Sequence, residues 1–202
     1  VFSKHYQVVT VDLRGHGQSS KAPGPYTISL FAADVAGLIT GLHLVPAHVV
    51  GISLGGMVAL QLAVSAPDLV RSLTIVNAGP EFTVQTLKGH LMILQRQLIV
   101  SLLGMRKMGD VLSKRLFPKP DHAEVRRLFV ERWAENDPRA YRAAAHAIIG
   151  WSVADRISAI QTPTLVIAAD HDYSPVADKE AYVARMPHAE LVVISDSRHA
   201  TP

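Results

Sequence analysis

The sequence predicts an α/β fold in which a mostly parallel sheet is flanked by helices and a helical lid is inserted between two of the strands. Two observations support this prediction. Strand-like and helix-like segments alternate before residue 81 and after residue 160, which is the order that βαβ units produce. Between these residues only helical patterns occur, and so long a detour is expected to fold as a unit of its own. We therefore expect residues 1–80 and 161–202 to form the core and residues 81–160 to form the lid.

The part of the core before the lid is expected to contain three strands and two helices. These are strands at Tyr6–Val11, Ala47–Val50 and Leu69–Val76, and helices at Ser29–His43 and Leu54–Ser65. Tyr6–Val11 is rich in β-branched residues, which are typical of strands. Ser29 is placed to cap the first helix, and Pro67 predicts the end of the second.

The lid and the rest of the core continue this pattern. Helices are expected in the lid at Phe82–Leu103, Arg106–Leu116, His122–Glu135 and Pro138–Ile149. After the lid, strands are expected at Thr164–Ala169 and Glu190–Ile194, with a helix at Val176–Met186 between them. Pro138 favours a helix start, because proline is well tolerated in the first helical turn.

The composition indicates a folded protein and excludes several kinds of chemistry. Hydrophobic residues make up 49% and charged residues 18%, and no apolar run approaches the roughly 18 residues of a membrane span. The chain has no cysteine, which excludes disulfides, thiol catalysis and cysteine-based metal sites and fits a cytoplasmic location. Aromatic residues make up 6% and form no strip with the basic residues, so we expect neither nucleic acid nor membrane as a partner.

One serine lies in a tight bend between an expected strand and an expected helix. Gly51-Ile52-Ser53-Leu54-Gly55 matches the pattern G-x-S-x-G, in which the glycines let strand and helix pass closely. The alternative is that Ser53 only caps the helix in a tight turn. As a nucleophile, Ser53 would stand at the carboxyl edge of the sheet, and the backbone N–H of Leu54 at the helix N-terminus would bind developing negative charge.

A nucleophilic serine needs a base and an acid that orients the base. His199 follows the last expected strand, where it can reach back over the sheet edge. Asp170 and Asp172 both follow the preceding strand. We favour Asp172 because it lies further into the loop, and Asp170 is the alternative, with turn capping as its other role. Glu81 ranks below both.

Four segments together resemble the α/β-hydrolase superfamily: Asp12–Ser19, Gly51–Gly56, Pro163–Pro175 and Asp196–Pro202. More narrowly, they are similar to its single-lid members, such as 3-oxoadipate enol-lactonases, small carboxylesterases, cofactor-free haloperoxidases and C–C bond hydrolases. The resemblance implies Ser53 as nucleophile, His199 as base and Asp172 as acid, with no metal or organic cofactor. It also implies that a second oxyanion donor lies before Val1, so we expect a fragment truncated at both ends.

The expected function is that of a serine hydrolase which cleaves an ester or lactone of a small, largely apolar molecule through an acyl-enzyme intermediate. The lid offers candidate pocket-lining side chains that could equally pack in its core: Leu91, Met92, Leu94, Leu98, Met105, Met108 and Trp133. The alternatives are C–C bond hydrolysis or cofactor-free perhydrolysis by the same residues, and a ligand-binding signalling protein built on the hydrolase framework.

Overall fold

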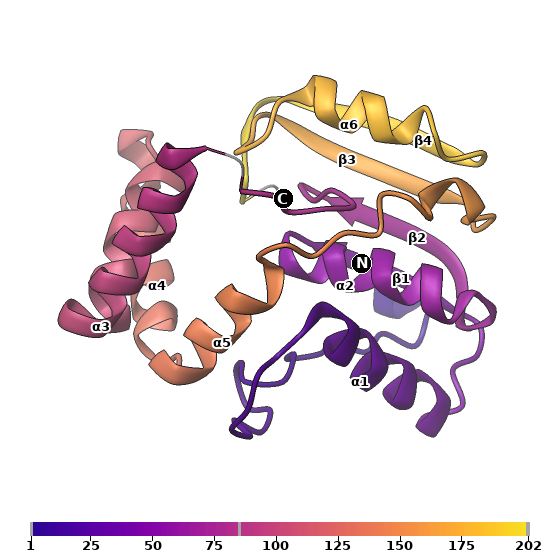
Figure 1. Cartoon of the computed structure of the whole chain (residues 1–202), viewed down its shortest axis with the longest axis horizontal. Coiled ribbons are helices and arrows are strands. Elements are labelled where there is room, and N and C mark those ends of the chain that lie inside the picture. Colours follow the sequence, from indigo (N-terminus) through magenta and orange to yellow (C-terminus); the bar gives the residue numbers. More distant parts are fainter. Residues whose placement is uncertain (1, 85, 201–202) are drawn as a thin grey trace.

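The computed structural model describes residues 2–84 and 86–200 of the chain. The strands are β1 (Ala47–Ile52), β2 (Val70–Val76), β3 (Thr164–His171) and β4 (Ala189–Arg198). The helices are α1 (Ile28–Gly41), α2 (Leu54–Ser65), α3 (Leu87–Leu116), α4 (Ala123–Ala134), α5 (Pro138–Ile148) and α6 (Val176–Val183), with single 3-10 turns at Phe2–Lys4, Pro67–Leu69, Pro120–His122 and Ile157–Ala159. The described elements are thus a sheet, three helices close to it and three helices at one side (Figure 1).

The four strands form one sheet in the order β1-β2-β3-β4, and each pairs in parallel with its neighbour. The expected α/β fold with a parallel sheet is therefore confirmed. Because all strands point the same way, their carboxyl ends meet at one edge of the sheet. The residues that follow β1, β2, β3 and β4 consequently lie near one another, although they are far apart in the sequence (Figure 1).

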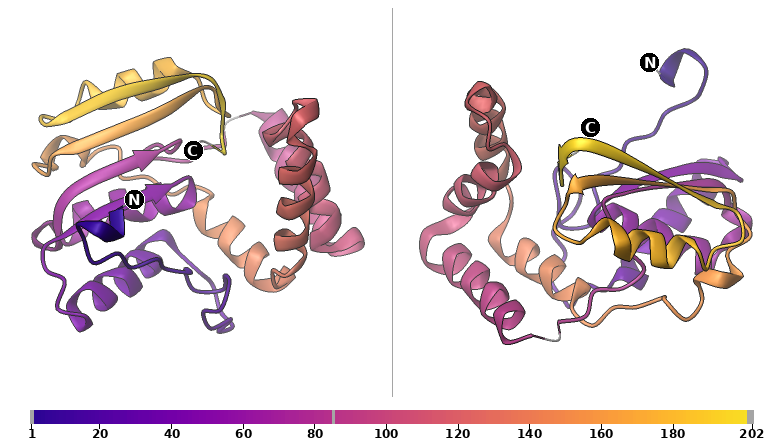
Figure 2. Two further views of the ribbon diagram at one scale, coloured as in Figure 1. Left: turned by 180° about the vertical axis from the view of Figure 1, so that it is seen from behind. Right: turned by 90° about the horizontal axis from the view of Figure 1, so that it is seen from above.

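The main hydrophobic core lies between the sheet and the helices α1, α2 and α6, which Figure 2 shows on the same face of the sheet. α2 contains no charged residue and is buried on most sides, as expected for a helix that is apolar all round. Its one buried polar side chain, Gln61, accepts a hydrogen bond from Nε1 of Trp151 at 2.9 Å. The opposite face of the sheet exposes Val50 and Ile52 of β1, together with Val192 of β4.

The prediction of a strand at Tyr6–Val11 is wrong. The backbone of Gln7–Val11 forms no strand, and the side chains of Tyr6, Val8, Val9 and Val11 are exposed. β-Branched residues favour an extended backbone, but a strand also needs a neighbour that supplies ladder hydrogen bonds. In the described part of the chain, β1 is the edge strand on this side and pairs only with β2, and the ring of Tyr6 merely packs edge-on against His48.

The first helix is capped two residues earlier than predicted. Thr27, not Ser29, is the N-cap residue of α1, and its hydroxyl oxygen accepts a hydrogen bond from the backbone N–H of Leu30 at 3.0 Å. Both residues satisfy the side-chain preference for a cap, and only the backbone decides between them. Thr27 has the extended conformation that an N-cap needs, with φ −137° and ψ 156°.

Helices α3, α4 and α5 lie between β2 and β3 in the chain and stand to one side of the sheet in Figure 1. α3 bends at Gly104, whose φ of 76° and ψ of 178° are not helical, close to where the sequence predicts a boundary between two helices. A second hydrophobic cluster joins these helices. Its buried members all belong to α3, namely Val100, Met105, Met108, Leu112 and Leu116, and aromatic side chains of α4 and α5 pack against them.

Candidate active site

Ser53 lies between the end of β1 and the start of α2, in a conformation that few non-glycine residues adopt. Its φ is 52° and its ψ is −117°, whereas a capping serine has an extended backbone. Its hydroxyl makes no capping hydrogen bond to the helix. Its backbone N–H is held by the carbonyl of Val76 at the end of β2, at 2.9 Å. The structure therefore contradicts the helix-capping alternative for Ser53, because neither its backbone nor its hydroxyl has the geometry of a cap.

The glycines around Ser53 are required by close backbone contacts. A Cβ atom added at Gly51 would lie 2.2 Å from the carbonyl oxygen of Gly55, closer than any real contact. A Cβ added at Gly56 would lie 2.6 Å from the Cβ of Ala78. The first contact is between β1 and α2, as the glycine pattern predicts, and the second is between α2 and the segment that follows β2.

Three side chains from three separate segments meet at the sheet edge. Nε2 of His199 lies 2.8 Å from Oγ of Ser53, and Nδ1 of His199 lies 2.5 Å from Oδ1 of Asp172. The side chain of Asp172 is 2% exposed and that of His199 is 17% exposed. Ser53 follows β1, Asp172 follows β3 and His199 follows β4, so the parallel sheet itself brings them together.

The hydrogen bonds assign the protons of this triad. An ionised carboxylate can only accept hydrogen bonds, so Nδ1 of His199 donates to Asp172 and Nε2 remains to accept from the hydroxyl of Ser53. Burial alone would raise the pKa of Asp172, but hydrogen bonds from His199, Lys179 and the backbone N–H of Tyr173 outweigh it and lower the pKa to about 2. Asp172 is therefore ionised at neutral pH, and Nε2 of His199 faces the hydroxyl of Ser53.

The two other acidic candidates lie outside this chain of hydrogen bonds. Asp170 accepts the backbone N–H groups of Asp196 and Ser197, each at 2.9 Å, which is the turn-capping role considered for it. The backbone of Glu81 forms an isolated antiparallel β-bridge with that of Ser152. Of the three carboxylates, Asp172 is the one in contact with His199.

Leu54 is the first residue of α2, directly after Ser53. The first four N–H groups of a helix have no partner within the helix, so the N–H of Leu54 is available to an oxygen atom bound beside Ser53. This is the position that the oxyanion prediction requires of Leu54.

Asn77, at the end of β2, supports the site and is not among the site residues predicted from the sequence. Its side chain is buried, accepts the backbone N–H of Ala169 at 2.8 Å and donates to the carbonyl of His199 at 3.0 Å. It thus ties the end of β3 to the segment that carries His199. Its place at the end of a predicted strand was the one signal in the sequence.

Lys179 was also missed. It lies on α6, and its ammonium group contacts Oδ2 of Asp172 at 2.6 Å, on the side of the carboxylate that faces away from His199. The whole residue is 1% exposed. A lysine seven residues after an aspartate carries no recognisable signal in a sequence, because only the turn between Asp172 and α6 brings the two together.

A stack of three side chains connects His199 to α3. The ring of Tyr173 stacks on the imidazole of His199 with 4.2 Å between their centroids, and the guanidinium of Arg115 lies 4.6 Å from the centroid of Tyr173. Nearby, Lys119 forms an ion pair of 2.5 Å with Asp196 of β4. The segment around the base is therefore in contact with the end of α3.

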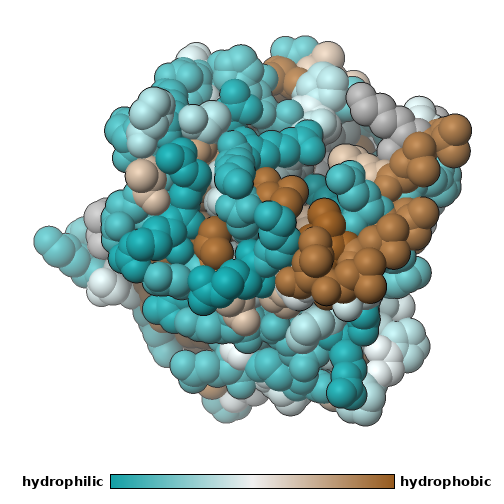
Figure 3. All heavy atoms as spheres, turned by 90° about the vertical axis from the view of Figure 1, so that its left-hand side faces the viewer, coloured by the Kyte–Doolittle hydropathy of each residue, from teal (hydrophilic) through white to brown (hydrophobic). Residues whose placement is uncertain are grey.

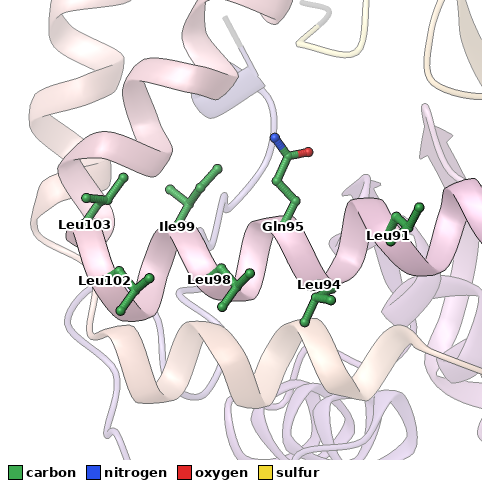
Figure 4. Close-up of a pocket in the computed structure, with 7 residues that line it drawn as sticks. All are labelled: Leu91, Leu94, Gln95, Leu98, Ile99, Leu102 and Leu103. Atoms are coloured by element: carbon green, nitrogen blue, oxygen red, sulfur yellow. The ribbon is translucent and has the colours of Figure 1, made fainter.

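The candidate pocket-lining side chains divide into three groups, one of which is Met92 alone, in a second groove beside Phe82 and Val84. Met105 and Met108 are buried in the second hydrophobic cluster, and Trp133 packs against it, so these three take the core-packing alternative. Leu91, Leu94 and Leu98 instead line a shallow groove of about 390 Å³ along α3 (Figure 4). Figure 3 shows an apolar patch on this side of the molecule, and the residues lining the groove do not include Ser53, Asp172 or His199.

Two kinds of feature are absent from residues 2–84 and 86–200. In this part of the chain, no cluster of three or more histidine or acidic side chains is arranged to hold a metal ion. Within the same residues, no helix combines the length and the apolar character needed to cross a membrane.

Comparison with known proteins agrees with this fold. The sequence profile described as alpha/beta hydrolase fold matches residues 1–201. An (E)-2-((N-methylformamido)methylene)succinate hydrolase of Acinetobacter baylyi is 27% identical over 98% of this chain and 75% of its own length. The 3-oxoadipate enol-lactonase 2 of the same organism is 26% identical over 97% of this chain and 73% of its own length. The crystal structure of the enol-lactonase from Burkholderia xenovorans LB400 superimposes with a TM-score of 0.87 at 26% identity, covering 98% of this chain and 75% of that one.

Proposed function

The chain belongs to the alpha/beta hydrolase fold family and is a hydrolase, and from this premise we propose that it cleaves an ester or lactone through an acyl-enzyme on Ser53. One observation carries the proposal. The hydroxyl of Ser53, the imidazole of His199 and the carboxylate of Asp172 form one continuous chain of hydrogen bonds, 2.8 Å and 2.5 Å long.

In the proposed reaction, Oγ of Ser53 attacks the acyl carbonyl carbon while Nε2 of His199 takes the hydroxyl proton. The carbonyl oxygen becomes negative and accepts a hydrogen bond from the N–H of Leu54. The bond to the leaving group then breaks, and the leaving oxygen receives the proton from His199. A water molecule repeats the cycle on the acyl-enzyme, with His199 again as base, and releases the carboxylic acid.

Asp172 contributes in two ways. It keeps the imidazole in the tautomer whose Nε2 can accept a proton, and its negative charge stabilises the imidazolium that forms during attack. The low pKa of about 2 supports this role, because Asp172 then stays ionised while His199 gains and loses its proton.

We propose a small, largely apolar acyl group, on the basis of the apolar character of α3. The groove at Leu91, Leu94 and Leu98 is not itself the acyl site, because no residue of the triad lines it. The enol-lactonase relatives support a lactone or ester as the bond that is cleaved. Arg115, stacked over Tyr173 close to the base, is the feature that would favour a negatively charged acyl group instead, so the substrate test must include one.

The experiment measures hydrolysis of p-nitrophenyl acetate, butyrate and hemisuccinate by wild-type protein, by Ser53→Ala and by Ser65→Ala. Ser65 is the matched control, because its hydroxyl only donates to the carbonyl of Gln61 at the end of α2. Loss of the nucleophile is expected to lower turnover by at least about 10³-fold, whereas Ser65→Ala keeps it within about threefold. Diethyl p-nitrophenyl phosphate is expected to release one equivalent of p-nitrophenolate per chain and to label Ser53.

Turnover that survives Ser53→Ala would refute the serine mechanism. Tight binding of one of these esters by the wild type, with negligible turnover, would refute hydrolysis as the function of this site. A higher kcat/KM for the hemisuccinate than for the butyrate would overturn only the apolar character of the substrate.

A further inference from the structure

We propose that Lys179 is a positioning residue of the triad. By binding Oδ2 of Asp172, it holds the carboxylate in the orientation in which Oδ1 accepts the hydrogen bond from His199. The inference rests on the proposed function, because it assigns Lys179 a part in the same reaction. It concerns a side chain that touches neither Ser53 nor the acyl group.

The ammonium group of Lys179 has three acceptors around it. Nζ lies 2.6 Å from Oδ2 of Asp172, 2.7 Å from the carbonyl oxygen of Ser174 and 2.5 Å from Oγ of Ser174. An ammonium group has three N–H donors and no acceptor, so all three donors are used. The position of Nζ is consequently defined by Asp172 and by the turn that precedes α6.

The carboxylate of Asp172 is held on both sides. Oδ1 faces His199 at 2.5 Å and Oδ2 faces Lys179 at 2.6 Å. Without Lys179, the carboxylate would keep His199, the backbone N–H of Tyr173 and a 3.5 Å contact with the hydroxyl of Ser174, but no charged partner would fix the direction of Oδ2. With the imidazole N–H on one oxygen and the ammonium group on the other, rotation would break two short hydrogen bonds to a charged carboxylate. Lys179 therefore restricts the direction from which Asp172 can approach His199.

The contact between Lys179 and Asp172 is buried. The side chains of Lys179 and Asp172 are each 2% exposed, so water cannot take over the role of either partner. A buried ion pair costs desolvation on both sides and is a poor source of stability compared with apolar packing. The same volume filled by an apolar residue would pack well but would leave Oδ2 of Asp172 with the hydroxyl of Ser174, 3.5 Å away, in place of a charged donor. We infer that the lysine is present at this position because it orients the carboxylate of Asp172, not because it stabilises the fold.

The direct readout is the proton between Nδ1 of His199 and Oδ1 of Asp172. Short hydrogen bonds of this kind give a proton NMR resonance far downfield of the amide region. Its position and sharpness report the geometry of this one bond, and a purely structural role of Lys179 would not change them.

The test compares the wild type with Lys179→Met, which keeps the length of the side chain but removes the charge and the donors, and with Lys179→Gln, which keeps a donor. Lys114→Met is the matched control, because Lys114 is exposed and pairs with Asp110 on α3. We expect Lys179→Met to lose or broaden the downfield resonance and to lower kcat for p-nitrophenyl butyrate by about 10–100-fold, with KM changed less than about threefold. Lys179→Gln should lie between Lys179→Met and the wild type, and Lys114→Met should match the wild type.

Rates are expressed per competent site, counted with diethyl p-nitrophenyl phosphate, so that a smaller folded fraction is not mistaken for slower chemistry. Unchanged kcat per site together with an unchanged resonance in Lys179→Met overturns the proposal, even if the variant melts at a lower temperature. If neither Lys179 variant folds, Ser174→Ala decides, because it removes one of the three acceptors and keeps the lysine. A resonance and a kcat equal to those of the wild type in Ser174→Ala then also overturn the proposal.

The test of Lys179 and the test of the proposed function can fail independently. Absence of ester turnover in the wild type, or turnover that survives Ser53→Ala, counts against the function. The downfield resonance does not depend on turnover, and its response to Lys179→Met tests the positioning role in either case.

Discussion

Replacing Asp172 by asparagine should change the stability of the protein in a pH-dependent way. The variant keeps the size of the side chain and removes a carboxyl group whose pKa falls from its ordinary value of 3.8 to about 2 on folding. Because the folded state binds the proton more weakly than the unfolded chain, the ionised group stabilises the fold above about pH 4. That contribution is lost as the pH falls from there toward about 2.

The magnitude follows from the size of the shift. A pKa that falls from 3.8 to about 2 corresponds to about 2.4 kcal/mol of unfolding free energy at pH 5. At pH 3 the unfolded chain is mostly protonated at this group, and about 1.3 kcal/mol remains. The stability difference between wild type and Asp172→Asn should therefore shrink by about 1.1 kcal/mol between pH 5 and pH 3.

The assay is urea unfolding at a series of pH values between 5 and 3, followed by the fluorescence of Trp133 and Trp151, the two tryptophans of the chain. Asp155→Asn is the matched control, because the side chain of Asp155 is 80% exposed and lies 3.9 Å from Arg156. Its stability should follow that of the wild type at every pH. A difference between wild type and Asp172→Asn that stays constant over this range would refute the argument that the fold holds Asp172 ionised.

Two further predictions concern stability. Gly51→Ala should destabilise the fold by about 3 kcal/mol or more, because the new Cβ would meet the backbone of Gly55. Gly37→Ala, where a Cβ in α1 would meet open space, should stabilise the fold by about 0.5–1 kcal/mol. Urea midpoints of the two variants check this, and similar midpoints would contradict the close passage of β1 and α2. Trp151→Phe should cost about 1–2 kcal/mol, because buried Gln61 loses its donor. Thermal unfolding followed by circular dichroism would show no change if the hydrogen bond contributed nothing.

The parts of the site that could be predicted are those that follow from topology. Ser53, Asp172 and His199 each follow a strand of one parallel sheet, and alternating strand and helix patterns are enough to expect their side chains at one edge. The glycines beside Ser53 identify the sharp bend before any geometry is known. The order of the elements and the break of α3 near Gly104 were predictable for the same reason, since apolar periodicity and glycine mark them locally.

The parts that could not be predicted depend on partners distant in the chain. Tyr6–Val11 has the composition of a strand, but composition does not tell whether a neighbouring strand offers hydrogen bonds. Asn77 reaches a carbonyl at His199, and Lys179 reaches Asp172 through a turn of defined shape. Side-chain hydrogen bonds of this kind have no periodicity, so they become visible only when the backbone is known.

The contact between α3 and the loop that carries the base has a consequence for recombining this protein with its relatives. Exchanging the helices between β2 and β3 looks like a way to alter selectivity while leaving the reactive residues alone. Yet Arg115 covers Tyr173, Tyr173 covers His199, and Lys119 holds Asp196. In a chimaera whose exchanged segment lacked cations at positions 115 and 119, the imidazole of His199 would be held less firmly. Residues 115 and 119 should therefore be exchanged together with residues 173 and 196.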